Sequence, residues 1–155
     1  EQSLMEKDIA RLSRGVVTIL ERGVFNVEET LAHIEAALAQ ERGLSAETQQ
    51  LVWKAMAYIH RHYAEMISRT DVAQHIGVSE DYLSHCFSEE AGIPFITYVN
   101  RYRLKQAKAL LVVGEQSVTD VAMETGFQSA SHFSRLFRRE VGVSPNAYRR
   151  GKRAG

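Results

Sequence analysis

Residues 117–142, SVTDVAMETGFQSASHFSRLFRREVG, contain the pattern that decides the fold of this chain. Ser117 is followed three residues later by Asp120, a spacing typical of the capping box that opens an α-helix. Gly126 lies where a left-handed residue would end that helix. The start of the stretch therefore predicts a short helix closed by a glycine turn.

A second helix follows the glycine, because Ser129 is a favoured N-cap residue. Its apolar residues recur three and four positions apart, which predicts one buried face formed by Phe133, Leu136 and Phe137. A helix, a tight glycine turn and a capped helix of about a dozen residues make a helix-turn-helix.

Residues 68–92, SRTDVAQHIGVSEDYLSHCFSEEAG, repeat this pattern. The matched pairs are Ser68 with Ser117, Gly77 with Gly126, Ser84 with Ser134, Phe87 with Phe137 and Gly92 with Gly142. The offset grows from 49 to 50 residues, which predicts one extra residue in the second copy just after its glycine. In this first copy Ser79 caps the second helix, whose predicted core residues are Tyr82, Leu83, Cys86 and Phe87. The chain therefore contains a duplicated module, with helix-turn-helix units at about 68–91 and 117–142.

A connector helix is predicted between the copies at about 94–113, because Pro94 suits a first helical turn and no breaker follows. At ~1.5 Å per residue, this helix spans roughly 28 Å. Successive major grooves of DNA are ~34 Å apart, so such a connector can place two reading helices in adjacent grooves. Ser144 and Pro145 predict a further short helix after the second copy.

The residues before the first copy predict two helices and one strand. The apolar stripe of residues 46–63 predicts the first helix of the main domain, capped by Ser45. Upstream, the β-branched run Val16–Leu20 predicts a short strand and residues 26–40 an amphipathic helix. Residues 1–45 are accordingly a partial upstream segment or linker, and residues 46–155 are an all-α domain.

The charge of the chain is balanced overall but unevenly distributed. The formal net charge is zero over 155 residues. Residues 1–46 carry −3, residues 47–100 carry −4 and residues 101–155 carry +7. A basic end of this kind favours contact with a polyanion, although a solvated basic face would give the same totals.

Composition and motifs exclude several other classes of protein. The single Cys excludes a disulfide framework, and no apolar run is long enough to span a membrane. The His residues lack Cys or acidic partners at metal-ligand spacing, and no catalytic motif occurs, so we expect no metal, no cofactor and no enzymatic activity. The chain begins with Glu1 and has no signal peptide, so we expect a piece of a longer, cytoplasmic protein.

The chain resembles the AraC/XylS family of bacterial transcription regulators over residues ~46–153. The segments that carry the resemblance are DVAQHIGVSEDYLSHCF, YVNRYRLKQAKALL and VTDVAMETGFQSASHFSRLFRREVGVSPNAYR. It implies seven helices in two helix-turn-helix units joined by a long helix. It also implies a domain that activates or represses transcription from promoter DNA.

Residues 1–45 resemble the last strand and helix of a response-regulator receiver domain, which would imply two-component signalling. The Lys-Pro that usually follows that strand is absent, and Glu21-Arg22 stand in its place. An upstream sensor or receiver domain is therefore the expected neighbour in the full-length protein.

Base reading is expected from outward residues near the start of each recognition helix. In the second unit these are Gln128, Ala130, Ser131, Ser134 and Arg135. Arg135 is the strongest candidate because arginine donates two hydrogen bonds to guanine, although a phosphate contact would also satisfy it. In the first unit the resemblance places Asp81, Ser84 and His85 at base-facing positions. Two adjacent acids, Glu80 and Asp81, predict an unusual base preference or a weak half-site there.

Phosphate contacts are expected from basic side chains and from helix N-termini. The candidates are Ser79, Arg101, Arg103, Lys105, Ser129, Arg138, Arg149 and Arg150. An internal salt bridge is the alternative for Arg103, whose position in the family is largely structural. The last basic residues, Lys152 and Arg153, are interpreted as a frayed tail.

Two functions from different classes remain open. The first is a sequence-specific regulator that places two recognition helices in successive major grooves of double-stranded DNA, with RNA polymerase as a further partner. The second is a protein-interaction module of the same fold that has lost DNA affinity and contacts RNA polymerase or a signalling partner through its acidic first unit.

Overall fold

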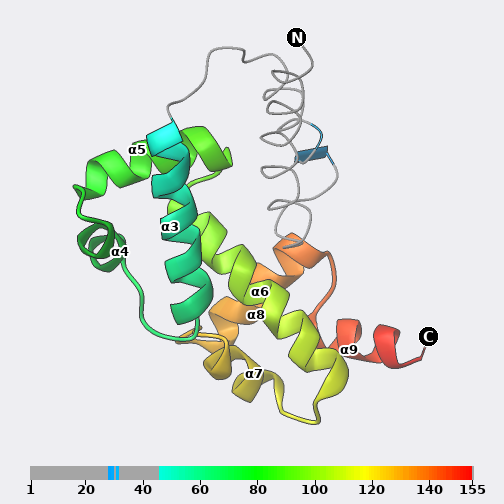
Figure 1. The fold of residues 1–155 in the computed structure, drawn as a ribbon. Coiled ribbons are helices and arrows are strands. Elements are labelled where there is room, and N and C mark those ends of the chain that lie inside the picture. Colours follow the sequence, from blue (N-terminus) through cyan, green and yellow to red (C-terminus); the bar gives the residue numbers. More distant parts are fainter. Residues whose placement is uncertain (1–27, 30, 32–45, 155) are drawn as a thin grey trace. The chain divides into compact units, whose positions relative to one another are not determined.

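The computed structural model describes Glu28, Glu29, Leu31 and residues 46–154 (Figure 1). The chain divides into two units, Glu1–Glu47 and Thr48–Gly155. All regular structure within residues 46–154 is helical, which confirms the all-α class. The helices are α3 (Ala46–His62), α4 (Arg69–Ile76), α5 (Glu80–Ala91), α6 (Phe95–Val113), α7 (Val118–Glu124), α8 (Ala130–Val141) and α9 (Pro145–Arg153).

The predictions for the N-terminal segment fall almost entirely outside the described residues. This holds for the strand at Val16–Leu20, for the Ser45 cap and for the resemblance to a receiver domain. Within the helix predicted at 26–40, only Glu28, Glu29 and Leu31 are described, and these three are helical.

Both predicted helix-turn-helix units are present as paired helices, α4 with α5 and α7 with α8. Each of these helices begins at a serine whose hydroxyl accepts a hydrogen bond from a backbone N–H within the first turn. This confirms the predicted caps Ser68, Ser79, Ser117 and Ser129. Such a cap satisfies a donor that the helix itself leaves without a partner, so the sequence defines these helix starts locally.

The two glycine turns are alike in geometry. Gly77 has φ 86° and Gly126 has φ 93°, the left-handed region that favours glycine. The residue after each glycine donates back to the carbonyl five residues earlier, Val78 to Ala73 and Phe127 to Ala122. One detail of the prediction is wrong: the cap of α7 is Thr125, and Gly126 follows it. The extra residue of the second copy lies after the glycine, as predicted.

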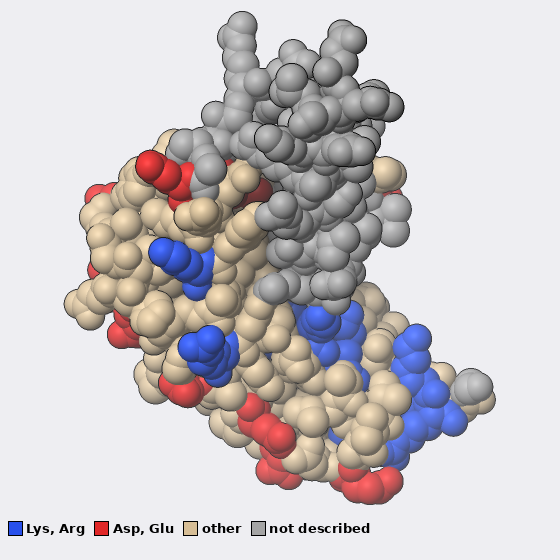
Figure 2. Space-filling model, viewed as in Figure 1, with Lys and Arg blue, Asp and Glu red and all other residues tan. Residues whose placement is uncertain are grey.

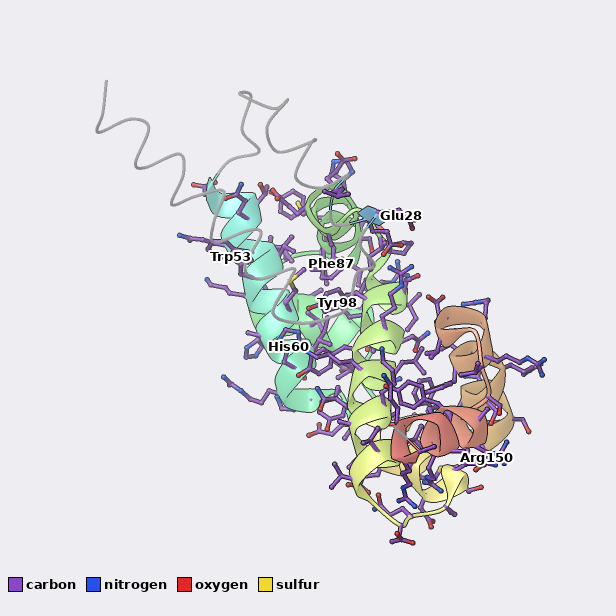
Figure 3. The ribbon with its side chains drawn as sticks, turned by 90° about the vertical axis from the view of Figure 1, so that its right-hand side faces the viewer. Glu28, Trp53, His60, Phe87, Tyr98 and Arg150 are labelled. Atoms are coloured by element: carbon purple, nitrogen blue, oxygen red, sulfur yellow. The ribbon has the colours of Figure 1, made fainter. Side chains whose placement is uncertain are left out.

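The connector helix α6 contributes to the core on both sides. Near its start Tyr98 packs against Phe87 of α5, with ring centroids 5.3 Å apart (Figure 3). Its second half supplies Leu104, Ala107 and Leu111 to a cluster that also contains Phe133 and Phe137 of α8. Pro94 is the N-cap of α6 rather than its first helical residue. Because the continuous helix α6 enters the cores of both helix-turn-helix units, it supports both of them.

The predicted core of α5 is confirmed except at one position. Leu83, Cys86 and Phe87 are buried, but Tyr82 is 47% exposed. The buried stripe starts at Leu83 and recurs three and four residues later. Tyr82 precedes it by one residue, about 100° around the helix, so its ring points toward solvent.

Candidate nucleic-acid interface

Helix α8 has an apolar face that is buried and a polar face that points outward. Phe133, Leu136 and Phe137 are buried, as predicted. On the other side Ala130 and Ser134 are partly buried, and the exposed candidates are Gln128, Ser131, Arg135 and Arg138. Ser131, Ser134 and Arg135 therefore share one face in the first half of the helix, where a recognition helix contacts base edges, and Arg138 extends this face into the last turn.

Basic residues gather in the second unit and in the terminal helix. Arg138 and Arg139 lie in the last turn of α8, and Arg150, Lys152 and Arg153 in the last turn of α9. Figure 2 shows Lys and Arg side chains gathered over α9. Cations at a helix C-terminus also complement the helix dipole. The C-terminal ends of α8 and α9 thus each carry positive charge that favours an anionic partner.

Helix α5 presents a different surface at the matching place. Glu80 and Asp81 occupy its first turn, and its last turn has no basic residue. Asp81 and His85 are exposed and Ser84 is partly buried. The Glu80 carboxylate accepts a 2.6 Å hydrogen bond from the hydroxyl of Thr70 on α4. Two carboxylates at the entrance of a recognition helix repel phosphate.

Sequence reasoning missed one cation beside this helix. Arg69 of α4 donates from Nη1 to the Ser84 hydroxyl at 3.0 Å. The signal was present in the repeat, because SRTDVA and SVTDVA differ only by Arg69 against Val118.

The phosphate role predicted for Arg103 is wrong in this structure, because its side chain is buried and hydrogen-bonded within the protein. Arg103 is 9% exposed. Its Nε donates to the Tyr63 carbonyl at 2.8 Å and its Nη2 to the Glu65 carbonyl at 2.9 Å. Burial lowers the pKa of the guanidinium below its ordinary value. The alternative of an internal role holds, but its partners are carbonyls rather than a carboxylate.

Gly126 lies beside the hydrogen bond between Arg103 and the Tyr63 carbonyl. A Cβ added there would lie 2.3 Å from the Tyr63 carbonyl oxygen and 2.8 Å from Nε of Arg103. The guanidinium of Arg103 also lies over the Phe127 ring, 5.9 Å from its centroid. The segment after α3, the connector α6 and the turn of the second unit therefore meet at one point, which fixes the second unit against α3 and α6.

Arg149 also turns inward. Its Nε donates to the Leu111 carbonyl at 3.2 Å and its Nη2 bonds the Gln116 carbonyl. These contacts fasten α9 to the end of α6 and to the loop after it, whereas phosphate contact by Arg149 stays a prediction. Arg150 is exposed.

The prediction that Lys152 and Arg153 form a frayed tail is wrong, because both residues belong to α9. Helix α9 continues to Arg153, which bonds the Gly114 carbonyl and pairs with Glu115 at 3.4 Å. The ammonium of Lys152 lies over the Tyr148 ring, 5.8 Å from its centroid.

The two remaining basic candidates on α6 have neighbours of their own. Arg101 is paired with Glu140 of α8, with Nε 3.4 Å from the carboxylate oxygen. The ammonium of Lys105 lies 6.0 Å from the centroid of the Tyr102 ring. Both side chains are only partly exposed, and each already has a neighbour within the domain.

Within the described residues, no three His, Cys, Asp or Glu side chains form a group that could hold a metal ion. None of the helices described is long and apolar enough to span a membrane.

Comparison with known proteins points to one family. A family profile described as a helix-turn-helix domain matches residues 72–151. The HTH-type transcriptional regulator YijO of Escherichia coli is 36% identical over 124 residues, covering 80% of this chain and 44% of that protein. The chain spans less than half the length of the curated relatives that it matches first.

Two solved structures are similar in both fold and sequence. The C-terminal domain of AraT, a response regulator from Geobacillus stearothermophilus, has a TM-score of 0.63 and 34% identity, covering 65% of this chain and 84% of that one. The DNA-binding domain of the global transcriptional factor AdpA, solved in complex with a target DNA, has a TM-score of 0.64 and 29% identity. That match covers 66% of this chain and 93% of that one.

Proposed function

This chain belongs to the AraC-type family of helix-turn-helix transcription regulators, and from this membership we propose that residues 46–155 are a sequence-specific DNA-binding domain. In this proposal α5 and α8 enter successive major grooves on one side of promoter DNA. The protein is a regulator rather than an enzyme and acts in the cytoplasm. An upstream sensor or receiver domain controls it, and RNA polymerase is its partner at the promoter.

The observation that carries the proposal is the two-sided character of α8. One face is buried in the core shared with α6, so the helix is rigidly supported. The opposite face presents polar and basic side chains at the positions from which a recognition helix reads bases. Helix α6 has 19 residues, or roughly 28 Å at ~1.5 Å per residue, which suits two helices in grooves ~34 Å apart.

The proposed base contacts come from both recognition helices. In the second unit they are Gln128, Ala130, Ser131, Ser134 and Arg135, with Arg135 donating to a guanine. In the first unit they are Asp81, Ser84 and His85. The proposed phosphate contacts are the backbone N–H groups beside Ser79 and Ser129 together with Arg101, Lys105, Arg138 and Arg150.

A second candidate function is favoured by the acidic start of α5. Glu80 and Asp81 oppose DNA but suit a basic protein surface. In this alternative the domain keeps the fold, has weak or no DNA affinity and contacts RNA polymerase or a signalling partner.

Fluorescence anisotropy on a random-sequence DNA pool at two salt concentrations, followed by sequencing of the bound fraction, separates the two functions. A DNA reader should lose affinity with salt at a slope of about −0.9 per phosphate contacted. Its bound fraction should be enriched in a motif that spans two adjacent major grooves. Absence of binding at low salt would reject the DNA-binding function and leave the protein-interaction module.

A further inference from the structure

The first helix-turn-helix unit is short of positive charge. Between residues 68 and 92 the only Lys or Arg is Arg69, against five Asp and Glu. Nonspecific affinity for DNA comes mainly from cations that neutralise phosphates. If this unit engages DNA at all, Arg69 is its one permanently charged side chain able to attract the backbone or to donate to a guanine.

The two copies use different residues at the position of Arg69. The matching residue of the second unit is Val118, which packs against the core cluster of that unit. At this position the first unit instead carries an exposed arginine. The same position thus carries a partly buried hydrophobic residue in one copy and an exposed cation in the other.

The geometry brings this cation to the reading face. Arg69 belongs to α4, yet its Nη1 lies 3.0 Å from the hydroxyl of Ser84 on α5. Ser84 matches Ser134 of α8, and the next residue, His85, matches Arg135. The guanidinium of Arg69 therefore lies one residue away from the position where the second unit has its main base-reading arginine.

The contact with Ser84 uses only part of the hydrogen-bonding capacity of Arg69. A guanidinium has five N–H donors, and the contact with Ser84 occupies one nitrogen. N–H groups of this kind donate to phosphate oxygens or to the O6 and N7 acceptors of a guanine. The neighbouring Thr70 bonds Glu80 at 2.6 Å, so α4 holds one of the two acidic groups of α5 beside the same surface.

We infer that Arg69 is the DNA-contacting cation of the first unit, supplied by α4 in place of the arginine that its recognition helix lacks. This inference rests on the proposed function. It makes Arg69 the residue that decides how strongly the first unit engages its half-site.

The test uses the full chain and the DNA site selected by the wild-type protein. Arg69→Val introduces the residue of the second copy, so we expect the fold to be kept. Arg69→Lys keeps the charge without the planar fork, and Arg61→Val removes an exposed arginine of α3 as a control. Anisotropy titrations at several salt concentrations give the affinity and the salt slope of each variant.

We expect Arg69→Val to weaken binding about tenfold and Arg61→Val to leave it unchanged. A phosphate contact predicts a uniform loss across sequences, a salt slope smaller by about one unit, and rescue by Arg69→Lys. A guanine contact predicts loss of preference at one base of the first half-site and no rescue by lysine. Either result supports the inference.

The alternative is that Arg69 only ties α4 to α5. Comparing the single variants Ser84→Ala and Arg69→Val tests this alternative. If the contact with Ser84 were the whole role of Arg69, both substitutions would lower the melting temperature equally and leave the salt slope unchanged. Wild-type affinity of Arg69→Val for the selected site would overturn the inference. Failure of the wild-type protein to bind any DNA would overturn the proposed function instead.

Discussion

The two helix-turn-helix units place matching residues in their interiors but different residues on their outward surfaces. Leu83 and Phe87 of the first unit are buried like Phe133 and Phe137 of the second. Outside, α5 opens with two carboxylates whereas α8 carries arginines. Packing therefore constrains the buried positions of the duplicated module, while the outward positions were free to diverge in charge.

The turn glycines show a second difference between the units. Gly77 and Gly126 have nearly the same φ, but an added Cβ meets nothing within 4 Å at Gly77 and meets the Tyr63 carbonyl at Gly126. The conformation is a local property of the repeat. The close approach belongs only to the second unit, because only that turn packs against the segment after α3.

The largest expected effect comes from alanine at these two glycines. Gly77→Ala adds only left-handed strain, about 1 kcal/mol. Gly126→Ala adds the same strain and a clash with Tyr63 and Arg103, so we expect a loss of about 3 kcal/mol or more in the free energy of unfolding. Urea denaturation followed by circular dichroism measures both. Equal losses would contradict the close packing at Gly126.

The next effect tests the junction that Arg103 forms. Arg103→Met leaves the Tyr63 and Glu65 carbonyls without their donor, and we expect a loss of about 2 kcal/mol in unfolding free energy. Arg139→Met, at an exposed arginine, should cost less than about 1 kcal/mol. Thermal melts of both variants give the comparison. A melt of Arg103→Met indistinguishable from that of Arg139→Met would show that the buried contacts carry no stability.

A third pair of variants compares the two reading surfaces. Arg135→Ala should weaken binding to the selected site by about 1–3 kcal/mol and relax preference at one base. His85→Ala, at the matching position of the first unit, should weaken it by less than about 1 kcal/mol, because α5 is repelled by phosphate. Anisotropy titrations at one salt concentration measure both losses. A larger loss for His85→Ala would invert the proposed order of the units.

The smallest effect concerns pH and the first unit alone. The hydroxyl and the backbone N–H of Ser68 donate to the Asp71 carboxylate and hold its pKa below the ordinary value. A lowered pKa in the folded state stabilises the protein above the ordinary carboxyl pKa, and this stability is lost as the pH falls through the folded value. Asp71→Asn should therefore make urea midpoints less sensitive to acid as the pH falls below about 4, and change little in their pH dependence above that. Identical pH profiles would contradict the assignment.

Local features of the fold could be predicted from the sequence, and long-range partners could not. Serine caps, glycine turns and apolar spacing depend on residues within one or two turns, so the starts of α4, α5, α7 and α8 were correct. The carbonyl partners of Arg103 and Arg149 lie 33 to 40 residues away in the sequence, so both arginines were assigned to phosphate instead. Nothing in local spacing distinguishes such a buried arginine from an exposed one.

The outward faces were predictable only in outline. The burial of Phe133, Leu136 and Phe137 left Arg135 and Arg138 on the opposite face, as periodicity required. The position of Arg69 depends on how α4 crosses α5, so the repeat alone could show that it differs from Val118 but not that it reaches Ser84.

The central claim is that the second unit anchors the protein on DNA and the first unit adds a weaker half-site. The most direct test is anisotropy titration with the selected DNA site in which each half-site is replaced in turn. Loss of base preference in Arg135→Ala identifies the half-site that α8 reads. The account predicts that replacing the α8 half costs at least about tenfold more affinity than replacing the α5 half. Equal losses, or a greater loss from the α5 half, would contradict it.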